Sequence, residues 1–493
     1  MKLLLITLLR FSIQILTSDS VKTASPQERL QIRIDSLAKS QLMQSGTVGI
    51  SIKSVISGQK ILEYNSRKSL TPASTMKLVS SATALMTLGE DFTYQTTLEF
   101  SGQVTDSVLL GNIYIKGSGD PSLGSWRFKG RPDYKQLTDI FAYKIKALGI
   151  REIKGSIIGD GSLFEENVIP DQWNWGDIGN YYGAGCGGLN INENLFYAVF
   201  KPGAYLEPAS LTNTLPDLPY YAKLNKVLTD RAGTKDQVMI YSSPYQDVIV
   251  LQGFVPSGSQ FSVKGSLPDP ALFSAFFLKK RLEELKITVT EGATSLMELN
   301  KRNLPYVRPL KTTPIYTQVS PTLAELAKEC NTHSINLYAE AFLKTPAVFL
   351  NLGNTTEAAL KGMSQIWMSK GIDLSGFMPK DGSGLSPSGG ITTDNMTEIL
   401  KYMKSEKSFG AFYNSIPVLG VSGTVASLGK RSKAAGNVRA KSGSIEGVRA
   451  YAGYFTSKSG ELMTFSIILN RYNGNASLAT KELEKLMIMM VDL

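Results

Sequence analysis

The end of the chain carries the pattern that most constrains the fold. Three runs of apolar, β-branched and aromatic residues follow one another, joined by short turns rich in Gly and Ser. These runs are 438–441, 448–456 and 462–470. Successive strands joined by turns this short pair in the antiparallel sense. A helix with one apolar face is predicted at 475–491, and it can cover one face of the resulting sheet.

In the rest of the chain, the predicted secondary structure changes from helical to β-rich and back to helical. Apolar residues recur at helical spacing in four segments, which are 26–43, 73–88, 270–286 and 321–344. By contrast, 93–269 consists of short β-like runs punctuated by Gly, Pro, Asn and Asp. We therefore predict an α+β domain that is discontinuous in sequence, formed by 25–92 and 270–493. Its antiparallel sheet is flanked by helices, and a large β-rich insertion of two subdomains occupies 93–269.

Composition excludes several classes of protein. Of 493 residues, 42% are hydrophobic and 19% are charged, which is typical of a globular chain and excludes global disorder. The net charge of +10 is spread along the chain without a long basic run, so a basic globular protein is favoured over a nucleic-acid-binding one. His333 is the only histidine, and Cys186 and Cys330 are the only cysteines. We expect no metal and no cofactor, and the two cysteines can pair or stay free.

The N-terminus resembles a secretory signal peptide. Lys2 precedes an apolar stretch, which a polar segment follows at 17–20. We predict a signal peptide within 1–24, cleaved near 18–24, and hence export to the periplasm. Arg10 interrupts the apolar stretch, so a short amphipathic helix is the alternative. No later run is long and apolar enough to predict a transmembrane helix.

A Ser-x-x-Lys motif at Ser74 and Lys77 begins a predicted helix after Pro72. The spacing places both side chains on one helical face. A serine hydroxyl needs an adjacent base to act as a nucleophile, and a lysine amine serves as that base when burial or a neighbouring cation lowers its pKa. In a chain with one histidine, Ser74 and Lys77 are therefore the candidate nucleophile and base.

The same spacing recurs at two places with a different context. Ser36 and Lys39 lie in an amphipathic helical segment, where a solvated face explains them. Ser427 and Lys430 lie in a Gly- and Lys-rich stretch that predicts a loop. Ser74 alone combines a preceding proline with a long apolar helix.

Two further short motifs follow toward the C-terminus. Ser334 and Asn336 form a Ser-x-Asn motif between two helical runs, where Ser334 is either an N-cap or a group that points into a cleft. Lys441, Ser442 and Gly443 are predicted to end a terminal strand, before Ser444 turns into the next one. Gly443 permits close approach of a substrate or of the Ser74 helix. An identical Lys-Ser-Gly at 458–460 is explained as a tight turn.

The order Ser-x-x-Lys, Ser-x-Asn, Lys-Ser/Thr-Gly resembles that of β-lactamases and penicillin-binding proteins. With a long insertion between the first two motifs, the chain is similar to class C penicillin-binding proteins of low molecular mass, the D-alanyl-D-alanine carboxypeptidase/endopeptidase family. Supporting segments are 72–78, 119–122, 192–194, 381–386, 417–420 and 423–424. Two places depart from the family: Ser442 replaces the usual Thr, and the segment 159–162, Gly-Asp-Gly-Ser, has Gly where a second Asp is common.

This resemblance implies a serine β-lactamase/transpeptidase-like fold and an acyl-enzyme mechanism on peptidoglycan stem peptides. Ser74 would attack a D-Ala-D-X bond, and Lys77 would take its proton. Ser334 would relay a proton to the leaving amine, while Asn336 would hold Lys77 and a substrate amide. Lys441 would supply positive potential and, with Ser442, meet the substrate carboxylate. The backbone amides of Ser74 and Ser444 would form the oxyanion hole, and β-lactams would trap Ser74.

Two other functions remain compatible with the motifs. The chain could be a penicillin-binding sensor of peptidoglycan that no longer turns over, or a serine β-lactamase that deacylates fast. All three motifs keep functional side chains, which favours an active peptidase over a sensor. No deacylating base is identifiable, which disfavours the β-lactamase. The balance of carboxypeptidase and endopeptidase activity stays open.

Overall fold

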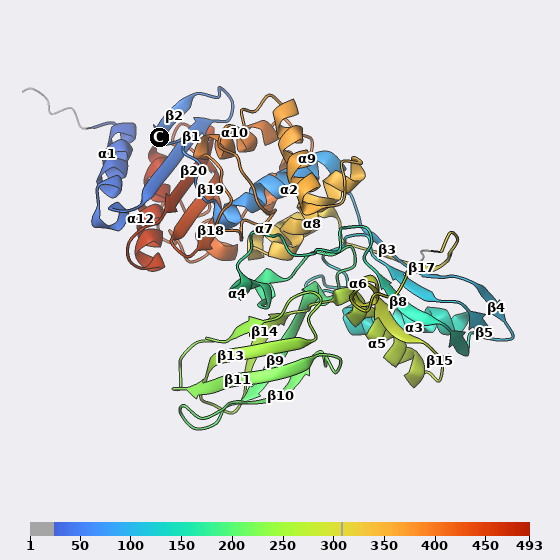
Figure 1. Cartoon of the computed structure of the whole chain (residues 1–493). Coiled ribbons are helices and arrows are strands. Elements are labelled where there is room, and N and C mark those ends of the chain that lie inside the picture. The colour runs from blue at the N-terminus through green and yellow to red at the C-terminus, as the bar shows by residue number, and fades with distance from the viewer. Residues whose placement is uncertain (1–23, 307–308) are drawn as a thin grey trace, which may run out of the picture.

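The computed structural model describes residues 24–306 and 309–493. All of the predicted signal peptide except Ala24 therefore lies outside the described residues. A five-stranded antiparallel sheet with the order β18-β19-β20-β1-β2 forms the centre of one half of the molecule (Figure 1). Its strands are β1 (Thr47–Ser54), β2 (Lys60–Tyr64), β18 (Arg439–Ile445), β19 (Val448–Thr456) and β20 (Leu462–Asn470). The prediction of an antiparallel sheet from the C-terminal strands is confirmed.

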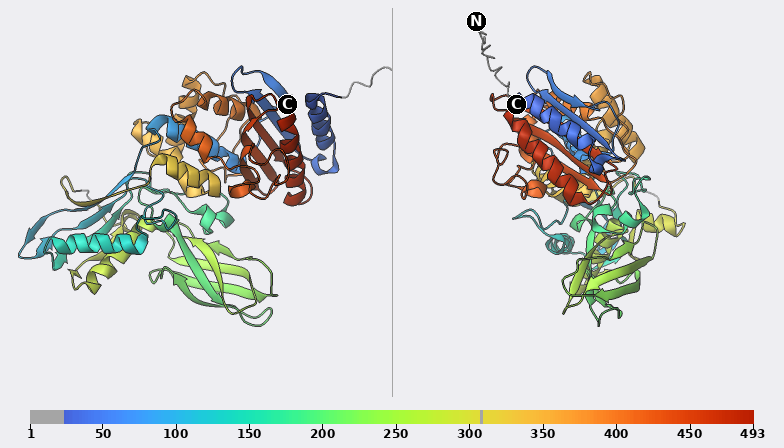
Figure 2. Two further views of the ribbon diagram at one scale, coloured as in Figure 1. Left: turned by 180° about the vertical axis from the view of Figure 1, so that it is seen from behind. Right: turned by 90° about the vertical axis from the view of Figure 1, so that its left-hand side faces the viewer.

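Two helices from opposite ends of the chain cover one face of this sheet. They are α1 (Pro26–Ala38) and α12 (Ala476–Met489), which lie side by side (Figure 2). Alternation along the strands explains the arrangement, because Ile467 faces these helices and its neighbour Ile468 faces the opposite layer. The C-terminal helix thus covers one face of the sheet, as predicted.

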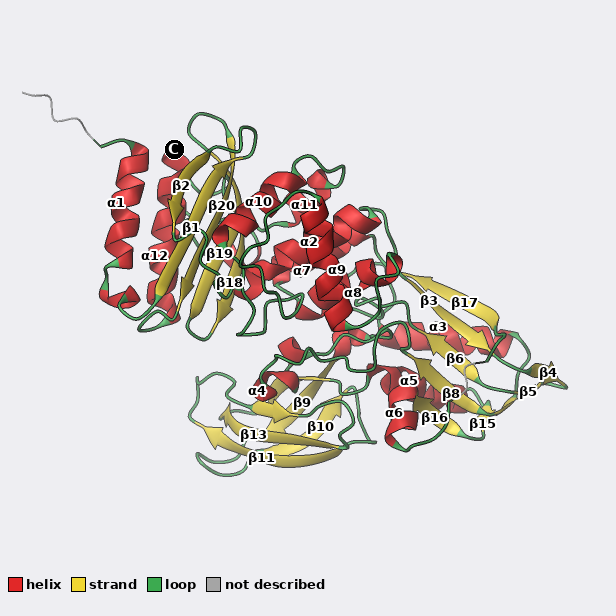
Figure 3. Ribbon diagram, turned by 45° about the horizontal axis from the view of Figure 1, so that its top comes forward, coloured by secondary structure: helices red, strands yellow, loops and turns green. Residues whose placement is uncertain are grey.

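The opposite layer is helical (Figure 3). Its members are α2 (Met76–Leu88), α7 (Leu323–His333), α8 (Asn336–Phe349), α9 (Thr356–Ser369), α10 (Thr393–Met403) and α11 (Phe409–Ser415). The first ten residues of α2 are all buried, because other helices and the sheet surround it. The helical periodicity at 321–344, with the Ser-x-Asn motif expected between two helical runs, corresponds to two helices, α7 and α8, which separate at Ser334.

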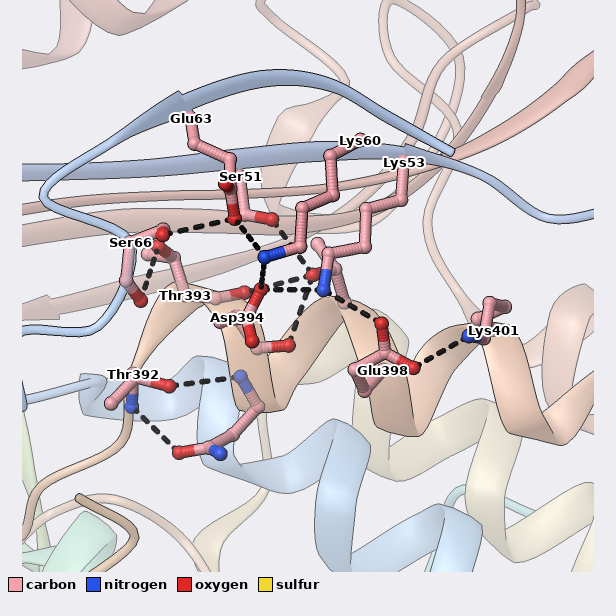
Figure 4. A network of polar contacts seen from close by, with 12 residues as sticks. Ser51, Lys53, Lys60, Glu63, Ser66, Thr392, Thr393, Asp394, Glu398 and Lys401 are labelled. Carbon is pink, nitrogen blue, oxygen red and sulfur yellow. Dashed lines mark hydrogen bonds and ion pairs between the residues drawn. The ribbon is translucent and has the colours of Figure 1, made fainter. Parts of the chain in front are cut away.

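A polar network joins α10 to β1 and β2 of the sheet (Figure 4). The Nζ of Lys53 on β1 lies 2.5 Å from Asp394 and 2.7 Å from Glu398, both on α10. The Lys53 side chain is fully buried. A buried ammonium is tolerated here because two carboxylates neutralise it.

The second half of the molecule begins with a mixed sheet, ordered β16-β8-β6-β3-β17. These strands are β3 (Gln95–Phe100), β6 (Ile113–Lys116), β8 (Ser156–Asp160), β16 (Gly292–Ser295) and β17 (Thr313–Val319). A small sheet extends it, formed by β4 (Gln103–Thr105), β5 (Val108–Leu110), β7 (Glu152–Lys154) and β15 (Thr288–Val289). Helices α3 (Tyr134–Ala147) and α5 (Pro270–Glu284) share the core of these sheets.

Two three-stranded sheets form a further lobe (Figure 1). One contains β9 (Leu195–Lys201), β10 (Ser210–Leu215) and β14 (Phe261–Ser266). The other contains β11 (Ala222–Asp230), β12 (Met239–Tyr241) and β13 (Val248–Pro256). The short helices α4 (Trp175–Ile178) and α6 (Leu296–Lys301) lie near the junctions between the lobes.

The structure differs from the sequence prediction in this second half. Helix α3 was not predicted, although Leu137, Phe141 and Ile145 recur at helical spacing on its buried face. Residues after 269 were expected to belong to the first domain, but the first of them pack with the inserted region. Phe273 and Leu282 of α5 belong to the core of the inserted sheets, and β17 pairs with β3. We therefore propose that the inserted region extends through β17.

Two further features follow from the described residues. Cys186 and Cys330 are both buried and free, so they do not pair. Across 24–306 and 309–493, none of the helices has the length and apolar character that crossing a membrane requires.

Candidate active site

The Ser74 segment is held tightly between two glycines. Ser74 lies in a short 3-10 turn, Ala73–Thr75, that leads directly into α2. The preceding Ala73 has φ = +46°, a left-handed conformation that is strained for a residue with a Cβ. A Cβ on Gly443 would lie 2.6 Å from the Pro72 carbonyl, and one on Gly384 would lie 1.9 Å from that of Ala73. Both glycines are therefore needed for this close packing.

Lys77 lies one helical turn after Ser74 and is fully buried. Its Nζ lies 2.9 Å from the Oγ of Ser74 and 2.6 Å from the Oδ1 of Asn336. It also donates to the backbone carbonyl of Ser383 at 2.7 Å. Three acceptors thus surround the amine, and one of them is the candidate nucleophile.

Burial lowers the pKa of Lys77 to about 8. Desolvation disfavours the charged ammonium. The nearby Cys330, Asp381 and Glu340 act in the opposite direction. Since burial raises the pKa of the Cys330 thiol to about 12, that thiol is uncharged at neutral pH. At pH 7 about a tenth of Lys77 is therefore a free amine, the form that a base requires, and the fraction rises with pH.

The break between α7 and α8 brings the second motif to the same place. Ser334 ends α7 in the left-handed conformation, with φ = 58° and ψ = 44°, and Asn336 begins α8. The Nδ2 of Asn336 donates to the carbonyl of Tyr182 at 2.7 Å. This contact orients the amide so that its oxygen faces Lys77. Ser334 is thus a C-cap, in contrast to the N-cap alternative.

Lys441 lies in the middle of β18, and its side chain is fully buried. The prediction that the motif ends the strand was wrong, because Ser442 and Ser444 continue the pairing with β19. The Nζ of Lys441 donates to the Oγ of Ser334 at 2.9 Å and to the carbonyl of Ser442 at 2.9 Å. Burial, followed by the charge of Lys77, holds the pKa of Lys441 well below its usual value.

A cavity of about 810 Å³ opens in front of these residues. Ser74, Ser334, Asn336 and Ser444 line it, whereas Lys77 and Lys441 contact it through the serines that they bind. Gly443 packs behind Ser74, and the Ser442 hydroxyl donates to the Thr424 hydroxyl at 2.7 Å.

Sequence reasoning missed the other cavity walls, which come from distant segments. These residues are Asn174, Asp177, Tyr182, Gly384, Leu385, Pro387, Ile445, Glu446, Gly447, Arg471 and Tyr472. The first three belong to the inserted region, so that region contributes part of the cavity wall. Apart from Gly384 and Leu385, which fall within the supporting segment 381–386, no local pattern marks them, because only tertiary packing brings them to the cavity.

The alternative copies of the motifs lie elsewhere. Ser36 and Ser427 are both exposed, on α1 and in a loop respectively. Lys458 is exposed in the turn between β19 and β20. His333 is half exposed, and its Nε2 lies 3.4 Å from Glu329. Within the described ranges, no group of three or more His, Cys, Asp or Glu side chains could hold a metal ion.

Curated relatives match over most of their length. A D-alanyl-D-alanine carboxypeptidase of Actinomadura sp. strain R39 is 26% identical over 483 residues, covering 94% of this chain and 86% of the relative. The D-alanyl-D-alanine carboxypeptidase DacB of Haemophilus influenzae is 25% identical over 444 residues, covering 88% of this chain and 87% of the relative.

The fold is also similar to a solved structure. The crystal structure of penicillin-binding protein 4 (dacB) from Haemophilus influenzae matches with a TM-score of 0.77 and 22% identity, covering 93% of this chain and 97% of that one. The predicted penicillin-binding-protein fold is thereby confirmed. The model of the D-Ala-D-Ala carboxypeptidase 3 (S13) family matches residues 30–491. From the ordered motifs, their convergence on one cavity and this match, we conclude that the chain belongs to the D-Ala-D-Ala carboxypeptidase 3 (S13) family.

Proposed function

We propose that the protein is an exported serine DD-peptidase that cleaves D-Ala-D-X bonds in peptidoglycan stem peptides. The observation that carries this proposal is the buried amine of Lys77, 2.9 Å from the Oγ of Ser74 at the wall of an open cavity. Membership of the S13 family and the carboxypeptidase names of the relatives support the reaction class. The resemblance of the N-terminus to a signal peptide supports export to the periplasm.

In the acylation step, neutral Lys77 accepts the proton of the Ser74 hydroxyl as Oγ forms a bond to the substrate carbonyl carbon. The backbone N–H groups of Ser74 and Ser444 stabilise the oxyanion, and each donor in such a site contributes about 3–4 kcal/mol to transition-state stabilisation. The C–N bond then breaks and leaves an acyl group on Ser74.

The leaving amine needs a proton when that bond breaks. Ser334 lines the cavity and relays to the amine, through its hydroxyl, the proton that Lys77 took from Ser74, while Lys441 binds that hydroxyl. The buried charge of Lys441 gives the cavity the positive potential that attracts the C-terminal carboxylate of a stem peptide. Asn336 holds Lys77 and meets a substrate amide. Water finally hydrolyses the acyl-enzyme and regenerates Ser74.

β-Lactams acylate the same serine in this proposal. A β-lactam ring presents a reactive amide beside a carboxylate, as a D-Ala-D-X peptide does. A β-lactam complex of the Haemophilus influenzae protein has a fold similar to this chain, with a TM-score of 0.73. The adduct is expected to be long-lived.

Incubation with D-Ala-D-Ala peptides and with cross-linked muropeptides tests the function. Release of D-Ala, together with stable labelling by a fluorescent penicillin, is the expected result. Labelling without any peptide product would instead indicate a sensor, and rapid turnover of the penicillin adduct would indicate a β-lactamase. The muropeptide digest also reports carboxypeptidase and endopeptidase cleavage separately.

A further inference from the structure

The third acceptor of Lys77 is a backbone carbonyl in a loop outside the three motifs. The loop comprises residues 381–386 and contains neither helix nor strand. The carbonyl of Ser383 accepts from the Nζ of Lys77 at 2.7 Å. This contact is intermediate in length between those to Asn336 and Ser74, so the position of the loop helps to determine where the amine lies.

Glu340 fixes this loop through two hydrogen bonds to its backbone. It lies on α8, one turn after Asn336, and its side chain is fully buried. Its Oε2 accepts from the backbone N–H of Gly382 at 2.9 Å, and its Oε1 accepts from that of Ser383 at 2.8 Å. Both carboxylate oxygens are therefore used to orient the peptide that carries the Lys77 acceptor.

Asp381 forms hydrogen bonds within its own loop. A residue of the inserted region in turn binds the Asp381 side chain. The two oxygens of Asp381 accept from the backbone N–H groups of Gly384 and Ser386, each at 2.7 Å. The Nε1 of Trp173 also donates to Oδ2 of Asp381 at 2.7 Å. Trp173 is buried, and it precedes α4 in the inserted region.

We infer that Glu340 and Trp173 are positioning residues that fix the 381–386 loop, and that the loop in turn holds Lys77 on Ser74 through the Ser383 carbonyl. The inference rests on the proposed function and extends it. Neither side chain lines the cavity, so both act through the loop. The inserted region, through Trp173, thus takes part in assembling the base.

The charge of Glu340 also affects the pKa of Lys77, which a pH profile can measure. The ionisable groups that face Lys77 are Cys330 on α7, Glu340 on α8, Asp381 in the loop and Lys441 on β18. Burial, followed by the charge of Asp381, raises the pKa of Glu340 to about 7. When Glu340 is ionised, its charge stabilises the Lys77 ammonium. Removing that charge therefore lowers the pKa of Lys77.

The test is the rate of acylation by a fluorescent penicillin, measured on the full chain from pH 5 to pH 10. In Glu340→Gln, an amide N–H₂ replaces one acceptor oxygen and faces a backbone N–H. We expect the limiting rate to fall by about 10-fold to 100-fold as Lys77 shifts from Ser74. We also expect the midpoint of the acid limb to move to lower pH. Glu357→Gln, an exposed substitution on α9, is the control.

Trp173→Phe keeps an aromatic ring at this buried position, but it loses the indole N–H donor to Asp381 and part of the ring volume. It tests the inference independently if Glu340→Gln does not fold. We expect its acylation rate to fall by about 10-fold in a protein that still unfolds cooperatively, with a lower melting temperature because the smaller ring leaves a space and Asp381 loses a donor. Trp175→Phe changes an exposed tryptophan two residues away and should leave the rate unchanged.

Two results would overturn the inference. One is a folded Glu340→Gln variant with the wild-type rate and midpoint. The other is a Trp173→Phe variant that acylates as fast as Trp175→Phe. The proposed function is tested separately by the wild-type protein and Ser74→Ala in the same assay, because only those two report whether Ser74 is the labelled residue.

Discussion

Lys441 donates a hydrogen bond to Ser334 across 2.9 Å, although the two residues are 107 positions apart in sequence. The contact joins β18 to the break between α7 and α8. Through this contact the buried amine of Lys441 acts on the cavity by way of the Ser334 hydroxyl, since Ser334 lines the cavity and Lys441 does not. The second and third motifs therefore function as one unit in the proposed mechanism.

Replacing Lys441 by Gln is expected to slow acylation by penicillin about 100-fold. The substitution removes the positive potential behind Ser334 and keeps a side chain that can donate a hydrogen bond. Folding should be unaffected, because the variant no longer buries a charge. Acylation kinetics and a thermal melt measure the two effects.

Lys458→Gln is the matched control, because Lys458 begins an identical Lys-Ser-Gly sequence that lies in an exposed turn. Its stability should change by less than about 0.5 kcal/mol, and its acylation rate should stay at the wild-type value. Equal rates and equal melting temperatures in the two variants would mean that the third motif is wrongly assigned.

Ser74→Ala should abolish covalent labelling by a fluorescent penicillin. The physical reason is the 2.9 Å contact with Lys77, which only this copy of the motif has in a buried environment. Ser36→Ala and Ser427→Ala should label normally, since both serines are exposed. Gel fluorescence of the three variants measures this directly, and undiminished labelling of Ser74→Ala would falsify the assignment of the nucleophile.

Part of this site could be predicted from sequence and part could not. The pairing of Ser74 with Lys77 depends on their three-residue spacing in a helix, which can be read directly from the sequence. The approach of Gly443 to the Ser74 segment was one of two alternatives, and a Cβ there would lie 3.1 Å from the Ser74 nitrogen. The contribution of Trp173 and Tyr182 has no local signal, since it depends on how the inserted region packs against α8 and the 381–386 loop.

The fold shows the same division. The strands β19 and β20 were predicted because their apolar runs are long and their turns are short. The extent of β18 was underestimated, because Ser442, Gly443 and Ser444 favour turns by composition but pair with β19 in the structure. The sequence predicted correctly that two helical runs separate near Ser334, but it did not predict the backbone conformation of that residue. Its left-handed conformation is that of a helix C-cap whose backbone N–H donates to the Cys330 carbonyl, and Gly or Asn, not Ser, is the residue that usually signals such a cap.

Lys77→Ala should lose nearly all acylation activity, whereas His333→Ala should keep most of it. Lys77 is the buried base of the proposal, and His333 is half exposed beside Glu329. Because burial lowers the pKa of Lys77 to about 8, the wild-type rate should rise with pH through that value as the amine loses its proton. A pH profile of wild-type acylation and single-pH rates of both variants measure this. The opposite ranking of the variants would favour a Ser-His mechanism.

The network around Lys53 supports a prediction about stability (Figure 4). Lys53→Met leaves Asp394 and Glu398, whose side chains are 22% and 28% exposed, without the buried cation that they share. Lys60 and Lys401 stay close to them, so the free energy of unfolding should fall by about 2 kcal/mol, less than for a fully buried pair. Urea unfolding at neutral pH measures it, with the exposed Lys68→Met as control.

The effect of Lys53→Met should also depend on pH. Burial alone would raise the pKa values of Asp394 and Glu398, but hydrogen bonds from the surrounding lysines hold both below their usual values in the folded protein. A carboxylate whose pKa is lowered by folding contributes stability above its unfolded pKa, about 4, and loses that contribution as the pH falls through its folded pKa. The difference in stability between wild type and Lys53→Met should therefore be largest near pH 7 and shrink toward pH 3. A difference that stays constant over that range would show that Lys53 stabilises the protein through the packing of its alkyl chain, and not through its charge.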